Sequence, residues 1–450
     1  MEEILLLTSF CITLYTWKSK HFHKSALHLF NLYWLVIFFL YSFRFLGLYS
    51  AREETFRMYF VGITSFFLGY VLLTFLWQSK KTETVPDKYI SIKKRVFIIL
   101  IFASVIIYIL KSLLALPLWL AGGMGEVKTS SIMESSLSLG IWDIFFVYVA
   151  KPLHATLMIY AVIAIFQGRK DRLLYISTAI LLVLGFVGTA SRFSIVEILI
   201  SAFAYVYLFT NLNFRQFAQK YPKLFTTSVS VLVVVFGFMA VSGNVFEGIY
   251  CYLCGCIPCS DNALLRLDES IRYNGIVTFN GVFRVFNQIP SMLGLTAGVR
   301  DILDLAYEYM IRFEETTEIG PGIRYNAFIS MFTYFYADAG YTGVWVLSFL
   351  FGGFTAVINK RAFINPTYSS CSLLLFIVIM IFNSIVRAQT FLVPSVMTLF
   401  YLYFLVPKER VVIIPHKRQR ESVIINREVL NNRGGVILRF PEAVPCLIFG

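Results

Sequence analysis

Long apolar segments recur along the whole chain, and they constrain its fold more than any other feature of the sequence. Hydrophobic residues make up 58% of the 450 positions and charged residues only 14%, against about 25% charged residues in soluble domains. A helix needs about 20 apolar residues to cross a bilayer, and these segments are continuous rather than alternating, which excludes a transmembrane β-barrel. The sequence therefore predicts an all-α, polytopic transmembrane helical bundle of about 11 spans. The predicted spans cover residues 4–17, 27–49, 58–77, 96–114, 141–166, 173–187, 193–209, 224–241, 343–358, 369–385 and 391–406.

The basic residues fall on every second connection between these spans. They occupy residues 18–24, 80–95, 169–172, 215–223, 360–361 and the tail from residue 408. Cytoplasmic connections collect lysine and arginine, so one orientation of the chain accounts for all of them. The N-terminus is predicted outside and the C-terminus inside. The net charge of +13 is then a topology signal, and it does not indicate a nucleic-acid-binding protein.

The domain organisation follows from the same pattern. We predict transmembrane helices 1–8 over residues 1–241, a large extracytoplasmic loop over residues 242–341, helices 9–11 over residues 342–406 and a basic cytoplasmic tail over residues 407–450. The loop carries six arginines and eleven acidic residues, a net charge of −5, which leaves +18 on the rest of the chain. Within the loop, residues 301–318 are predicted to form an amphipathic helix that lies on the membrane or roofs a cavity, and Gly-Pro-Gly at 320–322 ends it.

The fifth predicted span is interrupted by polar residues and a proline: Asp143, Lys151, Pro152 and His154. A charge at the centre of a membrane helix costs about 3 kcal/mol on insertion scales. Two arrangements fit the sequence equally well. One is a single crossing, and the other is an interfacial helix over residues 140–150 that leads into a shorter crossing.

Four cysteines lie close together in the predicted loop: Cys251, Cys254, Cys256 and Cys259. Zinc sites usually draw their ligands as two pairs from separated segments, so we predict no metal here. An extracytoplasmic compartment is oxidising, and we therefore expect disulfides at these positions.

Two arginines stand in short turns between spans on the predicted external side. Arg192 ends the sequence Gly-Thr-Ala-Ser-Arg over residues 188–192, and Arg387 occupies the matching position in Arg-Ala-Gln-Thr. A guanidinium at the level of the lipid headgroups can bind a phosphate with two hydrogen bonds, which lysine cannot do. The alternative is that each arginine only reaches out to lipid phosphates.

The loop supplies further candidate site residues. Arg284 lies in an apolar context, and Arg324 lies between the Gly-Pro-Gly turn and the next span, a position suited to a headgroup. Asp338 is the best candidate for a general base, because aromatic neighbours at the mouth of a span could raise its pKa; the alternative is a helix cap. Asn326 and Tyr336 are candidates for binding sugar, or are ordinary residues of the membrane interface.

Two of these stretches carry a resemblance to a known family. The turn over residues 188–192 is similar to the small-residue–arginine turn of bacterial O-antigen (oligosaccharide repeat unit) polymerases of the Wzy type. The segment from Asn326 through Asp-Ala-Gly-Tyr-Thr-Gly at 338–343, followed by an apolar run, resembles the start of a late span in those enzymes. Ala339 stands where the family usually has phenylalanine.

The resemblance implies a membrane glycosyltransferase with a GT-C-like fold, without metal or other cofactor, in the bacterial inner membrane. It would transfer a growing glycan from undecaprenyl pyrophosphate to a new undecaprenyl-pyrophosphate-linked repeat unit on the periplasmic face, and a chain-length regulator protein is an expected partner. In this chain Arg192 and Asp338 would be the catalytic residues, with Asp338 as base our own addition. Arg284, Arg324 and Arg387 would bind the pyrophosphate.

Two other functions fit the same layout. O-antigen ligases resemble this chain except that their large external loop carries a functionally important histidine, and residues 242–341 contain none. A lipid-linked oligosaccharide flippase or other transporter, which is not an enzyme, usually has repeated halves and short connections. We find no internal repeat in this chain.

Overall fold

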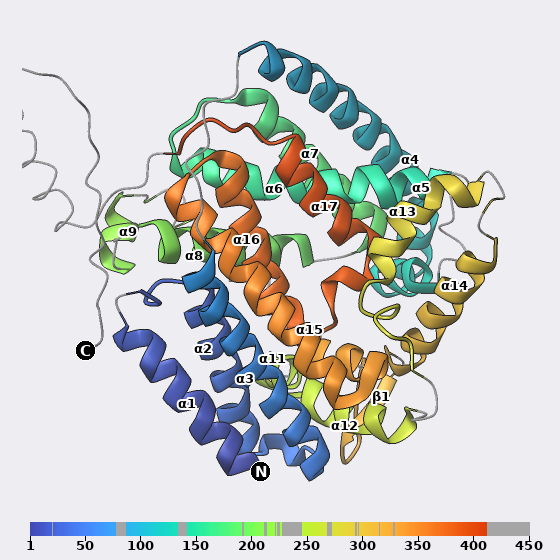
Figure 1. Ribbon diagram of the computed structural model, residues 1–450. Helices are drawn as coiled ribbons and strands as arrows, with labels where there is room; N and C mark the ends of the chain where they lie inside the picture. Colours follow the sequence, from blue (N-terminus) through green and yellow to red (C-terminus); the bar gives the residue numbers. More distant parts are fainter. Residues whose placement is uncertain are drawn as a thin grey trace, which may run out of the picture.

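The computed structural model describes residues 1–19, 21–77, 87–133, 142–190, 193–210, 214–220, 222, 226, 245–267, 272–292, 295, 297–314, 316–326 and 329–411. The described chain is mostly helical (Figure 1), which confirms the predicted fold class. Among these residues, six helices are long and apolar enough to cross a membrane. They are Glu53–Leu76, Arg95–Ala121, Trp142–Phe166, Arg172–Thr189, Met331–Ile364 and Tyr368–Ile385.

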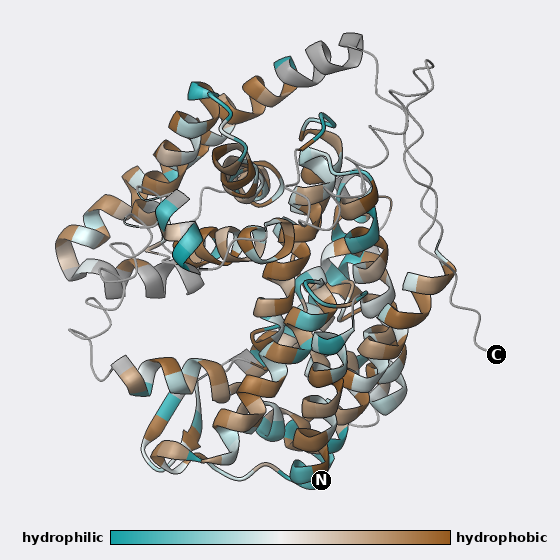
Figure 2. Cartoon of the chain, turned by 90° about the vertical axis from the view of Figure 1, so that its left-hand side faces the viewer, coloured by the Kyte–Doolittle hydropathy of each residue, from teal (hydrophilic) through white to brown (hydrophobic). Residues whose placement is uncertain are grey.

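Ten of the eleven predicted spans are helical, and the eighth, residues 224–241, lies outside the described residues. Hydrophobic residues run along the long helices (Figure 2). The helices of the first half are α1 (Glu2–Lys18), α2 (Ala26–Ser42), α3 (Glu53–Leu76), α4 (Asp87–Met133), α5 (Trp142–Phe145), α6 (Lys151–Phe166), α7 (Arg172–Thr189), α8 (Phe193–Phe209) and α9 (Phe214–Lys220). Those of the second half are α11 (Val245–Cys254), α12 (Cys256–Arg266), α13 (Asn280–Met292), α14 (Ala297–Ile311), α15 (Met331–Ile364), α16 (Tyr368–Phe382) and α17 (Val393–Phe404). The count of about eleven spans and the GT-C-like arrangement stay predictions.

Helix α16 lies at the centre of the helix packing. It is apolar on all sides, as expected of a helix that is surrounded by others, and it contacts α2, α6, α8, α15 and α17. Thr367 and Ser370 start it with reciprocal side-chain-to-backbone hydrogen bonds, which satisfy amide groups that have no partner within the helix. In Figure 1, α1, α2 and α3 lie with α15 on one side of it, and α6, α7 and α17 lie on the other.

The fifth span is a continuous helical segment, which favours the single-crossing alternative. A π-helical turn at Phe146–Ala150 joins α5 to α6, and Pro152 follows within the first turn of α6, where its missing N–H costs little. The charge of Asp143 is balanced by Lys111 of α4, at 3.1 Å between Nζ and Oδ1.

The prediction of one helix over residues 301–318 is wrong at its C-terminal end. Helix α14 stops at Ile311, and the chain then forms an antiparallel hairpin of β1 (Thr316–Gly320) and β2 (Ile323–Asn326). Two β-branched threonines at the start of β1 favour a strand. Gly322, with φ of 74°, supplies the left-handed conformation that the turn needs. The Gly-Pro-Gly sequence therefore turns a hairpin and does not end a helix.

The expected disulfides are also wrong. All four cysteines of residues 251–259 are buried thiols rather than halves of a disulfide. They pack as small apolar side chains on α11 and α12, with the Cys254 thiol directed at the Ile37 carbonyl of α2. Burial raises the pKa of Cys254 to about 12, so its thiol stays protonated and unreactive.

The packing of α3 against α15 depends on glycine. A Cβ atom at Gly352 would overlap the carbonyl group of Phe66, and one at Gly69 would overlap the carbonyl group of Phe349. The two backbones thus approach each other as closely as small residues allow, a common arrangement between membrane helices. This contact ties the N-terminal helices to α15.

We expect Gly352→Val to destabilise the fold by roughly 1–3 kcal/mol or more, because the new side chain must separate two backbones. Gly298→Ala is the matched control, since no atom lies near the position where its Cβ would be. Thermal unfolding of the purified chain in detergent measures both. Equal unfolding temperatures for Gly352→Val and the wild type would contradict the close helix contact.

Candidate functional site

A tight turn over residues 273–279 is fixed to α15 by one buried carboxylate. Asp338 is only 1% exposed. Its Oδ1 accepts the Val277 amide at 3.0 Å and its Oδ2 accepts the Thr278 amide at 2.9 Å, while its carbonyl accepts the Asn274 amide at 2.9 Å. A buried carboxylate is stable only when such donors replace water. These contacts favour a structural role for Asp338, as an anchor for a turn rather than the expected helix cap. Its role as a base stays a prediction.

Helix α15 breaks directly after this carboxylate. Ala339 has φ of −155° and Gly340 has φ of +61°, so the segment before residue 339 and the segment after 340 are two helices joined by a kink. A Cβ atom at Gly340 would lie 3.6 Å from Nη2 of Arg272. The guanidinium of Arg272 therefore lies at the break.

Arg272 is held over an aromatic ring at this position. Its Cζ lies 5.7 Å from the centroid of Tyr336, and the Tyr336 ring meets the Tyr341 ring edge-on at 5.2 Å. Among the residues that the structure describes, no carboxylate lies within ion-pair distance of Arg272. A cation and two tyrosines thus lie together where α15 breaks.

Arg284 contacts several partners through its guanidinium. Its Nη2 lies 2.6 Å from Oδ1 of Asp304, its Nε donates to Asn280 Oδ1 at 2.7 Å, and its Cζ lies 5.2 Å from the centroid of the Tyr307 ring. Tyr307 in turn stacks on Phe391 with centroids 5.1 Å apart. A phosphate at Arg284 would have to compete with Asp304.

The turn that carries Arg387 adjoins the same region. Thr390 donates its hydroxyl hydrogen to the Thr278 carbonyl at 2.8 Å, next to the amide that Asp338 accepts. Arg387 itself is half-buried between α16 and α17. The structure therefore brings the segments of Tyr336, Asp338, Arg284 and Arg387 together.

The remaining predicted site residues lie elsewhere or are not described. Arg324 is exposed on β2, opposite Glu318 of β1. None of its contacts in the described part of the chain joins it to Asp338 or Arg284. Asn326 pairs with Thr316 in the same hairpin, and its side chain is outside the description. Arg192 lies outside the described residues.

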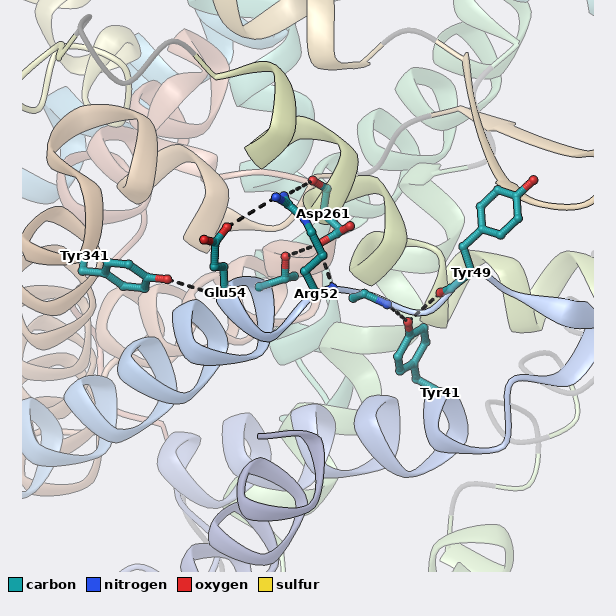
Figure 3. Close-up of polar contacts among 8 residues, drawn as sticks. Tyr41, Tyr49, Arg52, Glu54, Asp261 and Tyr341 are labelled. Atoms are coloured by element: carbon teal, nitrogen blue, oxygen red, sulfur yellow. Dashed lines mark hydrogen bonds and ion pairs between the residues drawn. The ribbon is translucent and has the colours of Figure 1, made fainter.

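A second polar network joins helix α12 of the loop to the start of α3 (Figure 3). Asp261 of α12 accepts the Arg52 amide at 3.0 Å and the Thr55 hydroxyl, so it caps α3 from a distant segment. The Arg52 guanidinium also contacts Asp261, with Nε at 3.2 Å. Tyr341, just after the break in α15, donates to the Glu54 carbonyl at 3.2 Å.

Arg272, Arg52 and Asp261 are site or anchor residues that the sequence does not single out. An N-cap usually precedes its helix directly, whereas Asp261 is 209 positions from Arg52, so no local pattern marks it. Arg272 offers one weak signal, since it is an arginine beside a Tyr-Asn-Gly turn sequence. Among the described residues, no group of three or more histidine, cysteine or acidic side chains could hold a metal ion.

We expect Asp338→Ala to loosen the turn at residues 273–279, because it leaves two buried amides unsatisfied at a cost of about 1–3 kcal/mol each. Asp338→Asn keeps one acceptor oxygen and should lose less. Hydrogen–deuterium exchange of this turn measures the effect, with Asp301→Ala, an exposed acid on α14, as control. Wild-type protection in Asp338→Ala would refute the anchoring role.

The hairpin should respond to acid through Glu318. The Gly322 amide (3.2 Å) and the Tyr49 hydroxyl (3.0 Å) donate to its carboxylate and lower its pKa. A lowered pKa stabilises the folded form above the ordinary glutamate value of about 4.3, and this contribution is lost as pH falls through the lowered value. The measurement is NMR of a labelled Tyr49, with Glu318→Gln as control. A Tyr49 signal that titrates identically in both proteins would contradict the contact.

No protein-family model, no curated protein and no solved structure matches the chain. The interpretation of the site therefore depends on its own side chains and their contacts.

Proposed function

We propose that this chain is a membrane glycosyltransferase of the O-antigen polymerase type, which extends a lipid-linked glycan on the extracytoplasmic face of a bacterial inner membrane. The observation that carries the proposal is the position of Arg272 over Tyr336, where the apolar helix α15 breaks. A lipid diphosphate presents its charge at the end of a hydrophobic chain. A fixed guanidinium at the end of an apolar helix suits such a group.

The chemistry needs the groups that are gathered at this site. The bond between the anomeric carbon of the growing glycan and its diphosphate breaks, and the diphosphate leaves with the electron pair. A hydroxyl of the incoming repeat unit forms the new bond to that carbon and gives up its proton, which an oxygen of the departing diphosphate can accept. Fixed guanidinium groups stabilise the negative charge that develops on the leaving diphosphate. Tyrosine rings such as Tyr336 and Tyr341 offer apolar faces for sugar rings to pack against.

The individual roles are part of the proposal. Arg272 would bind the diphosphate, joined by Arg387 from the neighbouring turn and by Arg284 after exchange of Asp304 for a phosphate oxygen. Arg192 keeps the catalytic role given by the resemblance. Asn326 and Arg324 would contact substrate from the hairpin of β1 and β2.

Asp338 is better suited to positioning Arg272 than to accepting a proton, because both of its oxygens already accept amide hydrogens. Proton acceptance by Asp338 stays the alternative, as the sequence analysis proposed. The substrate, an undecaprenyl-pyrophosphate-linked oligosaccharide, and a chain-length regulator as partner stay part of the same proposal.

Deletion of the gene in its host tests the function. Loss of long glycan chains with a single repeat unit still attached to the lipid core supports a polymerase. Long chains that accumulate unattached would indicate a ligase, and repeat units trapped inside the cell would indicate a flippase. Either of the last two results would overturn the proposal.

The deletion strain, complemented with variants, tests the residues. We expect Arg272→Ala and Arg192→Lys each to lower polymerisation by about 100-fold or more, the usual loss when one donor to a developing charge is removed. Arg266→Ala, an exposed arginine of the same loop, is the control and should leave chain lengths unchanged. Immunoblots must show equal amounts of each variant in the membrane. Wild-type chain lengths in Arg272→Ala would exclude its assigned role.

A further inference from the structure

Helix α13 is turned with its polar side toward the protein and its apolar side away from it. Asn280, Arg284 and Gln288 recur at every fourth residue, so they share one face of the helix. Phe286 lies on the opposite side and is 74% exposed, and Phe283, between it and the polar row, is 44% exposed. In water an amphipathic helix buries its apolar face, and α13 does the reverse.

The inward direction of the polar row is fixed by specific contacts. Asn280 donates to the Leu303 carbonyl of α14 at 2.8 Å, and Arg284 pairs with Asp304. The amide oxygen of Gln288 accepts the Tyr148 hydroxyl at 2.9 Å. Phe283 and Phe286 are therefore exposed because the polar residues of α13 are bonded to the rest of the protein.

Helix α14 continues the exposed apolar surface. Leu303, Ala306 and Met310 face inward and are buried. Val299, Ile302 and Leu305, which share a neighbouring face, are 47%, 51% and 57% exposed. The rest of the protein thus covers only part of the apolar side of α14. The adjacent side chains of Arg300 and Asp304 form an ion pair, with Nε and Oδ2 3.6 Å apart.

This surface adjoins helices that are apolar enough for a bilayer. Tyr148, which holds α13 in place, belongs to the candidate span Trp142–Phe166, whose Trp142 and Phe145 are also exposed. A Cβ atom at Gly281 would overlap the backbone of Leu392, so α13 also lies directly on the segment that leads into α17. Figure 1 shows α13 beside α14 and next to α17.

We propose that α13 and α14 form a lipid-binding hairpin, seated in the outer interface of the bilayer through Phe283, Phe286, Ile302 and Leu305. A strongly amphipathic helix of low overall hydrophobicity lies in the interface rather than across the membrane. Water would leave this apolar surface unfavourably exposed, whereas acyl chains cover it in continuity with the neighbouring spans. The inference is independent of glycan synthesis, and it assigns a membrane contact to a part of the loop that is too polar to be a span.

The test is the depth of single nitroxide labels in the full-length chain, one copy per phosphatidylethanolamine–phosphatidylglycerol nanodisc. Labels are placed by Phe286→Cys, Leu305→Cys and Glu308→Cys in a chain with Cys11→Ser and Cys446→Ser. Glu308 is the matched control, because it is exposed on the charged side of α14. Collision rates with oxygen, which concentrates in hydrocarbon, are compared with those of a water-soluble nickel chelate.

We expect the oxygen-to-nickel ratio at positions 286 and 305 to exceed that at position 308 severalfold. The proposal would be overturned if positions 286 and 305 were as accessible to nickel as position 308, since α13 and α14 would then project into water. Shielding of both labels from both reagents would also overturn it, because protein would then cover the surface. All three positions are on the surface, so a monodisperse elution profile confirms that the labelled chains are folded.

Discussion

The carboxylate of Asp338 is the contact on which the position of the turn over residues 273–279 depends. It is buried, and an ionised carboxylate without donors would be strongly destabilised there. The amides of Val277 and Thr278 provide the donors. If the turn between α12 and α13 moved away from α15, the buried carboxylate would lose both hydrogen bonds. The position of Arg272 follows from this turn. One residue of a membrane helix thus sets the geometry of a long polar segment.

The break in α15 divides the helix into two parts with different tasks. Residues 341–364 pack on α3 through Gly352 and Gly69, a contact that leaves no room for adjustment. Residues 331–338 hold the loop. Gly340 joins the two parts with a positive φ, and its missing side chain lets the Arg272 guanidinium approach the backbone. The loop is therefore held by a helix whose other part packs closely against α3, and such a fixed support is what a preorganised site requires.

The sequence predicts what depends on local composition and misses what depends on tertiary contacts. The apolar runs predict helices because a bilayer or a helix-lined core accepts only such segments. Asp338 is recognisable because an acid beside aromatic residues at the mouth of a span is rare, but its donors come from residues 277–278 and cannot be read locally.

Periodicity also has limits as a signal. It carries the predicted helix over residues 301–318 past Ile311, because Phe313 continues the apolar face of Ile302, Leu305 and Tyr309. The same pattern cannot tell which face of α13 turns inward, since Phe283 and Arg284 keep their spacing in either orientation. The segments that carry Arg284 and Arg387 lie together, whereas Arg324 lies on β2. That these arginines bind one pyrophosphate stays a prediction.

Electrostatics and the position of the α13–α14 hairpin together suggest how an anionic lipid would reach the site. The loop has a net charge of −5, so a diphosphate that arrives through water meets repulsion. That repulsion is screened beyond a Debye length of about 8 Å at physiological ionic strength, but it acts at the short distances where binding occurs. A lipid-linked substrate that moves sideways in the bilayer comes instead past a surface whose charges, Arg284, Arg300 and Asp304, are already paired. It then meets Arg272, for which the described residues offer no competing carboxylate. Lateral entry beneath the proposed membrane-seated helices α13 and α14 would therefore reconcile an acidic loop with the proposed negatively charged substrate.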